Sequence, residues 1–156
     1  MNAALGLKES SRAKVLGLLD PLLADEYVLY TKTRNFHWNV VGPRFNDMHK
    51  FFEAQYEVLD GHVDAVAERS RALGGRALGS LKEFLASARL KESAGRTMKE
   101  PVMLAELLGN HEALIRSLRA DVEETTRLGD AGTADFLTGL LAEHEKMAWM
   151  LRSFIS

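Results

Sequence analysis

Apolar residues recur at α-helical spacing through most of this chain, and no segment shows the alternation typical of a β-strand. The pattern is clearest over about residues 46–73, where apolar side chains repeat every seven residues along one face. Similar patterns predict three further long helices, at about residues 10–39, 101–127 and 133–154. The sequence therefore predicts an all-α protein.

Pro21 is an interruption within the first of these helices. Either it kinks one long helix, or Asp20 caps a second helix that begins at the proline. The periodicity continues on both sides of Pro21, which favours one helix from about residue 10 to residue 39. The Gly42-Pro43 pair is then expected to keep the helix from continuing further.

A long connection, about residues 74–100, separates the second long helix from the third. Within it, Ser80 and Glu83 have the spacing of a capping box, which predicts a short helix over about residues 81–89. Such a connection can cross the length of a bundle and keep the second and third long helices parallel. The prediction is an all-α, ferritin-like four-helix bundle with a short extra helix in the long crossover.

Composition limits what this bundle can do. Its 156 residues suit one domain, residues 1–156, in which residues 1–9 form a short and flexible N-terminal arm. The chain has no cysteine, which excludes disulfides, thiolate chemistry and sulfur-based metal sites. The formal net charge of −2 does not favour nucleic acid. No apolar run approaches the ~18 residues of a membrane span, and no secretion signal is evident, so we expect a cytoplasmic protein without membrane contact.

The second long helix carries a polar stripe beside its apolar one. At about 100° per residue, Glu53 lies on the same face as His49, and Asp64 lies only about 20° from Glu53. Carboxylates alone would be interpreted as a solvated face, but His37 and His49 bracket the tight turn, and solvation does not explain two imidazoles there. The candidate metal ligands are therefore His37, His49, Glu53, Asp64 and Glu68.

One chain cannot gather these ligands around one ion. At about 1.5 Å per residue, Asp64 lies about 22 Å from His49 along the helix axis. Two copies related by a two-fold axis could do so, because antiparallel copies of the helix would bring the two ends of the stripe together. Nitrogen and oxygen ligands suit iron, manganese or zinc, and several carboxylates favour a redox-active iron pair. We expect an intersubunit site.

The interior of a single bundle is the competing location, since ferritin-like di-iron proteins place Glu-x-x-His motifs there. No glutamate in this chain has a histidine three residues later; Glu68, for example, is followed by Arg71. The sequence therefore predicts no metal site inside the bundle. His62, His111 and His144 have no evident partners and are expected to be surface or structural residues.

The segment 37–42 (HWNVVG), the pair Met48-His49 and the acidic positions that follow resemble the signature of the Dps mini-ferritins, the DNA-protection-during-starvation family. The resemblance extends to AERSRALGG at 67–75, to SLKEFL in the crossover and to EKMAWML near the C-terminus. It implies a hollow homododecamer of two-fold dimers that oxidises Fe(II), preferentially with hydrogen peroxide, and stores ferric iron. Such a cage protects against oxidative stress by suppressing hydroxyl-radical formation.

The resemblance also implies a role for individual residues. By the family pattern, each two-fold interface holds two irons, with His37, His49 and Glu53 from one subunit and Asp64 and Glu68 from its mate. Glu53 occupies a position that is more often aspartate, and a longer side chain there could alter binding of the second iron.

Residues beside this site and at the start of the last helix have two interpretations each. Trp38 adjoins the site, where it either packs or quenches radicals. Asp130 and Asp135 either line an iron-entry pore at a threefold axis or are helix-start acids favoured by the macrodipole.

DNA binding is the property of the family that the sequence supports least. Lys8, Arg12 and Lys14 could form a short basic arm, but Glu9 lies among them and no basic extension follows the last helix. Twelve such arms could bind DNA weakly at low salt. A nucleoid-binding cage is thus the alternative function, and a bundle that holds zinc structurally is a third possibility.

Overall fold

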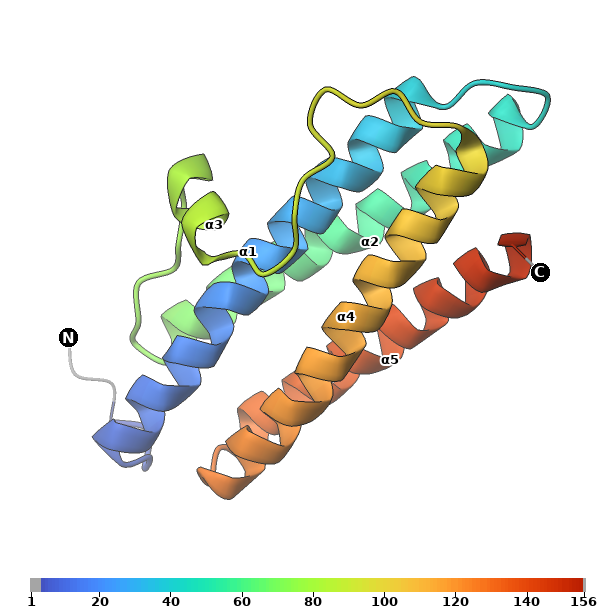
Figure 1. The fold of residues 1–156 in the computed structure, drawn as a ribbon. Helices are drawn as coiled ribbons and strands as arrows, with labels where there is room; N and C mark the ends of the chain where they lie inside the picture. Colours follow the sequence, from blue (N-terminus) through green and yellow to red (C-terminus); the bar gives the residue numbers. More distant parts are fainter. Residues whose placement is uncertain (1–3, 156) are drawn as a thin grey trace.

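Four long helices and one short helix make up the computed structural model, which describes residues 4–155 and contains no strand within them. The long helices run side by side as a bundle, and the short helix lies outside it (Figure 1). In chain order they are α1 (Glu9–Asn39), α2 (Phe45–Ala72), α3 (Leu81–Ser87), α4 (Glu100–Arg127) and α5 (Ala131–Ile155). The predicted all-α bundle with an extra helix is confirmed, with each helix end within a few residues of its expected position.

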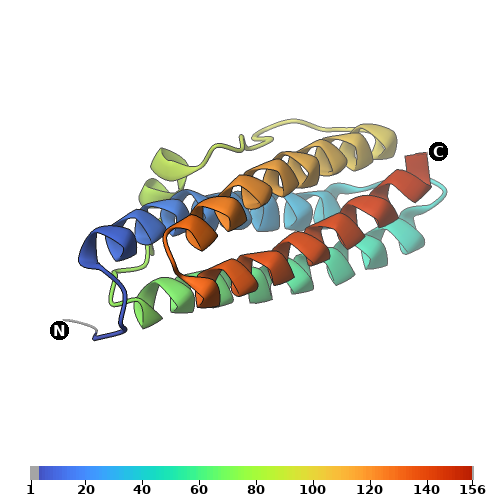
Figure 2. The ribbon, with the colours of Figure 1, turned by 90° about the horizontal axis from the view of Figure 1, so that it is seen from below.

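The bundle consists of two antiparallel helix pairs. Helix α1 packs on α2, α4 packs on α5, and contacts of α1 with α4 and of α2 with α5 join the pairs (Figure 2). Helix α3 packs on the outer side of α1, and the crossover returns along the bundle to the end at which α2 began (Figure 1). As predicted, this connection makes α2 and α4 parallel.

Local sequence signals set the helix ends. Helix α1 continues through Pro21 without interruption, so the single-helix interpretation is correct. Gly42 follows α1 with a φ of 126°, and Gly74 follows α2 with a φ of 80°, conformations that L side chains rarely adopt. The capping box is present as predicted: the Ser80 side chain accepts from the Glu83 backbone, and the Glu83 carboxylate accepts from the Ser80 backbone.

The N-terminal segment is only partly the arm that the sequence suggested. Residues 1–3 of that arm lie outside the described residues, and α1 begins at Glu9. Arg12 and Lys14 lie within α1, and the Arg12 guanidinium donates to the Leu73 carbonyl at 3.1 Å. The basic arm therefore does not extend as far as residue 14, and its binding to DNA stays a prediction. Among the described helices, none combines the length and apolar character needed to span a membrane.

Large apolar side chains from all four long helices fill the centre of the bundle. Phe36 of α1 and Phe52 of α2 are at most 1% exposed, and their ring centroids lie 6.4 Å apart. This contact joins α1 to α2 close to the turn that connects them. The core therefore fixes the part of the chain that carries the predicted histidines.

The Asp25 carboxylate ties the crossover to α1. Asp25 is 1% exposed, and its Oδ1 accepts from the backbone nitrogens of Arg89 and Leu90 at 2.6 and 2.9 Å. Its Oδ2 accepts from the Arg89 Nε at 2.7 Å. One side chain thus satisfies three donors just after the end of α3.

Replacing Asp25 by alanine should lower the free energy of unfolding by about 1–3 kcal/mol, because two backbone donors lose their acceptor. Asp25→Asn should cost less, since its amide oxygen can still accept. Urea denaturation of both variants measures the difference. Equal stability of Asp25→Ala and the parent would show that the crossover does not depend on this carboxylate.

Candidate metal centre

The turn between α1 and α2 brings the two predicted histidines together. His37 lies in the last turn of α1, and His49 lies near the start of α2. Their rings stack with centroids 3.7 Å apart and an interplanar angle of 21°. His37 is buried at 6% exposure, whereas His49 is half-buried.

Reciprocal hydrogen bonds fix the tautomer of both rings. The Nδ1 of His37 lies 2.7 Å from the His49 carbonyl oxygen, and the Nδ1 of His49 lies 2.8 Å from the His37 carbonyl oxygen. A carbonyl oxygen can only accept, so each Nδ1 carries a proton and donates it. In each neutral ring the lone pair is then at Nε2, the atom that remains to bind a metal.

Glu53 lies one helical turn beyond His49 and is half-buried. The Tyr56 hydroxyl is 3.4 Å from Glu53 Oε1, and the Tyr56 ring meets His37 edge-on at 5.2 Å. Burial and then the negative charge of Glu53 raise the pKa of Tyr56, so its hydroxyl keeps the proton that it donates. Tyr56 therefore contacts both the Glu53 carboxylate and the His37 ring.

Asp64 and Glu68 lie farther along α2, where both are exposed in the single chain. The helix is continuous between His49 and Asp64, so the two residues are separated by about 22 Å along its axis. Within the described residues, no group of three potential ligand atoms close enough for one metal includes His37 or His49. The single chain thus brings together the two histidines, with Glu53 one turn on, and keeps the other two carboxylates apart from them.

Large apolar side chains are exposed around the histidine pair. Trp38, Val41 and Phe45 are 64%, 72% and 47% exposed, and the Phe45 ring stacks on His49 at 5.1 Å. The Arg34 guanidinium lies over the Trp38 ring at 5.2 Å from its centroid. Clustered apolar exposure of this kind is typical of a surface that another protein molecule covers.

The two aspartates considered for a pore differ in environment. Asp130 is 4% exposed and is the N-cap of α5, where its Oδ1 accepts from the Thr133 backbone at 2.9 Å and its Oδ2 accepts from the Thr133 hydroxyl at 2.5 Å. Arg69 also donates to Asp130 Oδ1 at 3.1 Å. Asp135 is exposed and lines a surface depression with Thr126 and Ala131. The helix-start interpretation thus describes Asp130, and the pore remains a prediction.

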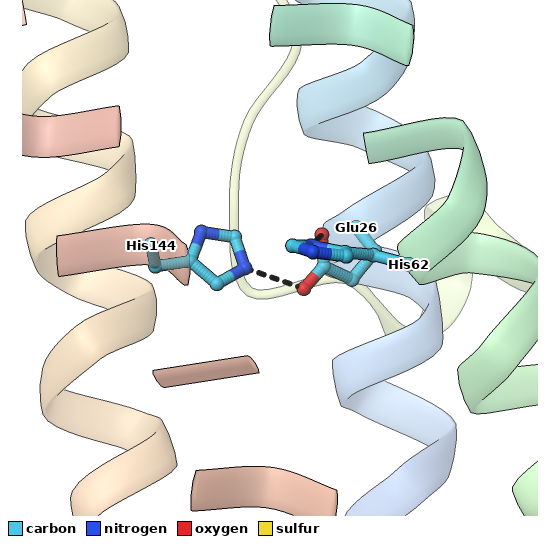
Figure 3. Close-up of side chains that lie close together, drawn as sticks. All are labelled: Glu26, His62 and His144. Carbon is cyan, nitrogen blue, oxygen red and sulfur yellow. Dashed lines mark hydrogen bonds and ion pairs between the residues drawn. The ribbon is translucent and has the colours of Figure 1, made fainter. Parts of the chain in front are cut away.

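The bundle interior, where the sequence predicts no metal site, holds a group of potential metal ligands. His62, His111 and His144 are buried rather than at the surface, and Glu26 lies among them at 0% exposure. Single ligand atoms of Glu26, His62 and His144 all lie within 4.8 Å of one another (Figure 3). Each residue comes from a different helix, so no short motif such as Glu-x-x-His could reveal the group.

Charge and hydrogen bonding keep Glu26 ionised in this interior. Burial alone would raise the pKa of Glu26, but the hydrogen bond and charge of His144, with the nearby His62 imidazole, lower it to about 2. Burial and then the neighbouring His144 lower the pKa of His111 to about 3, so that ring is neutral. The interior therefore holds a carboxylate anion in contact with imidazoles.

Comparisons with known proteins agree with the fold. The family model for the ferritin-like domain matches residues 16–156. A low temperature-induced protein of Nostoc sp. strain PCC 7120 is 50% identical over 152 residues, which cover 97% of this chain and 85% of that protein. DNA protection during starvation protein 2 of Bacillus anthracis is 37% identical over 92% of this chain and 97% of that protein.

Solved structures give the same result. Dps from Thermosynechococcus elongatus superposes with a TM-score of 0.91 at 33% identity, covering 94% of this chain and 93% of that one. A Dps protein from Vibrio cholerae O1 gives a TM-score of 0.94 at 30% identity, covering 100% of this chain and 98% of that one. That protein is described as a member of a superfamily of ferritin-like diiron-carboxylate proteins. Fold and sequence thus define a ferritin-like domain. The chain belongs to the Dps family of mini-ferritins, and this membership supports a role in iron storage and protection.

Proposed function

We propose that this protein is a ferroxidase that oxidises Fe(II) with hydrogen peroxide at the two-fold interfaces of a hollow homododecamer and stores the ferric product inside. The reciprocal bonding of His37 and His49 carries this proposal, because it leaves two Nε2 lone pairs available side by side. The position of Asp64 and Glu68 on α2 supports it, since both side chains are exposed in the single chain and are therefore open to contact by a second copy. Membership of a diiron-carboxylate superfamily supports iron as the substrate.

The roles of the ligands follow from their chemistry. His37, His49 and Glu53 of one subunit, with Asp64 and Glu68 of the mate, would hold two Fe(II) ions per site. Each Fe(II) gives up one electron; peroxide takes both electrons and two protons, its O–O bond breaks, and two waters form. Because both electrons leave together, no hydroxyl radical is released.

Glu53 is the ligand position on which this chain differs from the usual family pattern. Its longer side chain places the carboxylate farther from the backbone, and the Tyr56 hydroxyl holds it at 3.4 Å. We therefore propose that the second iron binds more weakly than the first. Glu53→Asp should tighten that second step, which an anaerobic Fe(II) titration would show as a change in stoichiometry.

Anaerobic loading of the purified protein with Fe(II), followed by stoichiometric peroxide, tests the proposal. Ferric absorbance reports the oxidation, and a spin trap reports hydroxyl radical. The expected result is oxidation much faster than that of free Fe(II), with little trapped radical. Oxidation no faster than in buffer, or radical yields equal to those of free iron, would contradict the proposed activity.

A further inference from the structure

The centre of the bundle holds four polar side chains that the proposed ferroxidase site does not use. Glu26 of α1, His62 of α2, His111 of α4 and His144 of α5 are all at most 8% exposed. Burying a carboxylate and three imidazoles among apolar side chains is unfavourable unless each polar atom finds a partner. Their arrangement therefore needs a physical reason.

Hydrogen bonds within the group do not supply all of these partners. His144 Nε2 is 2.7 Å from Glu26 Oε1, the contact that Figure 3 marks with a dashed line. His62 Nδ1 is 3.7 Å from Glu26 Oε2, which is too long for a hydrogen bond. Glu26 Oε2, His62 Nδ1 and His111 Nε2 are buried atoms without a hydrogen-bond partner.

The separation of the unpartnered atoms suits two ligands of one metal ion. With bonds of about 2.0–2.2 Å, two ligand atoms at a tetrahedral zinc lie about 3.3–3.6 Å apart. The observed 3.7 Å between His62 Nδ1 and Glu26 Oε2 is close to this value. One cation between them would satisfy both atoms. His144 can supply a third ligand, because all three residues offer ligand atoms within 4.8 Å of one another.

His111 contacts the other ring nitrogen of His144. Its Nδ1 is 2.9 Å from His144 Nδ1, so one of these two nitrogens must carry the proton between them. If His144 binds a cation through Nε2, the proton is at His144 Nδ1, which donates to His111. His111 would then fix both the tautomer and the orientation of the His144 ring, as partners of metal-bound histidines commonly do.

We propose that Glu26, His62 and His144 form a second metal site inside each bundle, which takes one divalent cation of the zinc class and is separate from the intersubunit iron site. Imidazole nitrogens with a single carboxylate and no sulfur suit zinc more than a pair of irons, which several carboxylates would favour. The site is closed and joins three of the four long helices, α1, α2 and α5. Its cation therefore stabilises the fold and takes no part in catalysis. The proposal does not rest on the ferroxidase activity.

Cobalt is the probe for this site, because tetrahedral Co²⁺ absorbs visible light strongly whereas Zn²⁺ does not. The His37→Ala/Asp64→Ala protein is expressed in Co²⁺-supplemented medium, so that the cation is present while the bundle folds and the intersubunit site is disabled. The same protein with His62→Gln or His144→Gln is the comparison. Metal content by mass spectrometry and the visible spectrum are measured on the intact oligomer.

The expected result is about one Co²⁺ per subunit with a tetrahedral spectrum, and loss of both in the glutamine variants. Thermal unfolding is a second measurement: Co²⁺ or Zn²⁺ should raise the Tm only where all three ligands are present. If His144→Gln does not fold, His62→Gln alone is the comparison variant. Absence of the ion and of the Tm shift from the parent would overturn the proposal and leave a buried ion-pair cluster alone.

A His111→Phe variant tests the role of that ring. It keeps an aromatic side chain but removes the acceptor of the His144 proton, and Co²⁺ affinity should fall about 10–100-fold with a shifted spectrum. A purely structural role of His111 would leave the spectrum and the affinity unchanged.

Discussion

A His37→Ala/Asp64→Ala double variant is expected to oxidise Fe(II) no faster than iron in buffer. The change removes one imidazole from the end of α1 and one carboxylate from the polar stripe of α2. If the site is intersubunit, every copy of it then lacks a ligand from both subunits. The rate of ferric absorbance after stoichiometric peroxide, with the radical yield beside it, measures the loss.

A matched variant separates loss of the site from loss of charge. Glu57→Ala/Asp60→Ala removes two exposed acidic side chains from the same helix without touching the proposed ligands. It should oxidise Fe(II) like the parent, and size-exclusion chromatography should give the same oligomer for both variants. A double variant at His37 and Asp64 that assembles and retains the parent's rate would place the chemistry elsewhere.

Phe52→Ala is expected to cost about 3–5 kcal/mol of unfolding free energy, a larger loss than that expected for Asp25→Ala. Phe52 is fully buried and meets Phe36 across the α1–α2 contact and Phe51 beside it. Truncation leaves a cavity that rigid neighbouring helices cannot close. Chemical denaturation monitored by circular dichroism measures the change.

Phe52→Leu is the control, because it keeps most of the volume and should cost below about 1.5 kcal/mol. A much larger loss of unfolding free energy in Phe52→Ala than in Phe52→Leu would show that the effect comes from packing volume. Equal losses in both would mean that the ring contact with Phe36 matters more than the volume. A loss below about 1 kcal/mol in Phe52→Ala would contradict the packing that the structure shows.

Much of the fold could be predicted from the sequence because its signals are local. The seven-residue repeat in α2, the capping box at Ser80 and the glycines after α1 and α2 each act within a few residues. Even the correct choice of a single helix through Pro21 needed only the periodicity on either side. The proximity of His37 and His49 could also be predicted, since a short turn links the two helices that carry them.

Local signals do not predict the buried cluster of Glu26, His62, His111 and His144. Glu26 and His144 are 118 positions apart, and they meet because α1 and α5, which belong to different helix pairs, both face the centre of the bundle. Helical periodicity assigns each residue a face but does not say which faces meet at which height. His62, His111 and His144 therefore looked unpartnered, and Glu26 drew no attention. A polar residue at a core position in each of four helices is the signal that could have indicated a common site.

The central claim is that each iron site is shared between two subunits, and mixed oligomers test it most directly. His37→Ala and Asp64→Ala chains, each inactive alone, are co-expressed with different tags and purified as mixed assemblies. Random pairing leaves about a quarter of the two-fold sites with both native ligands, so the mixture should recover about a quarter of the parent's peroxide-dependent Fe(II) oxidation. A mixture as inactive as its two components would contradict a site built from two chains.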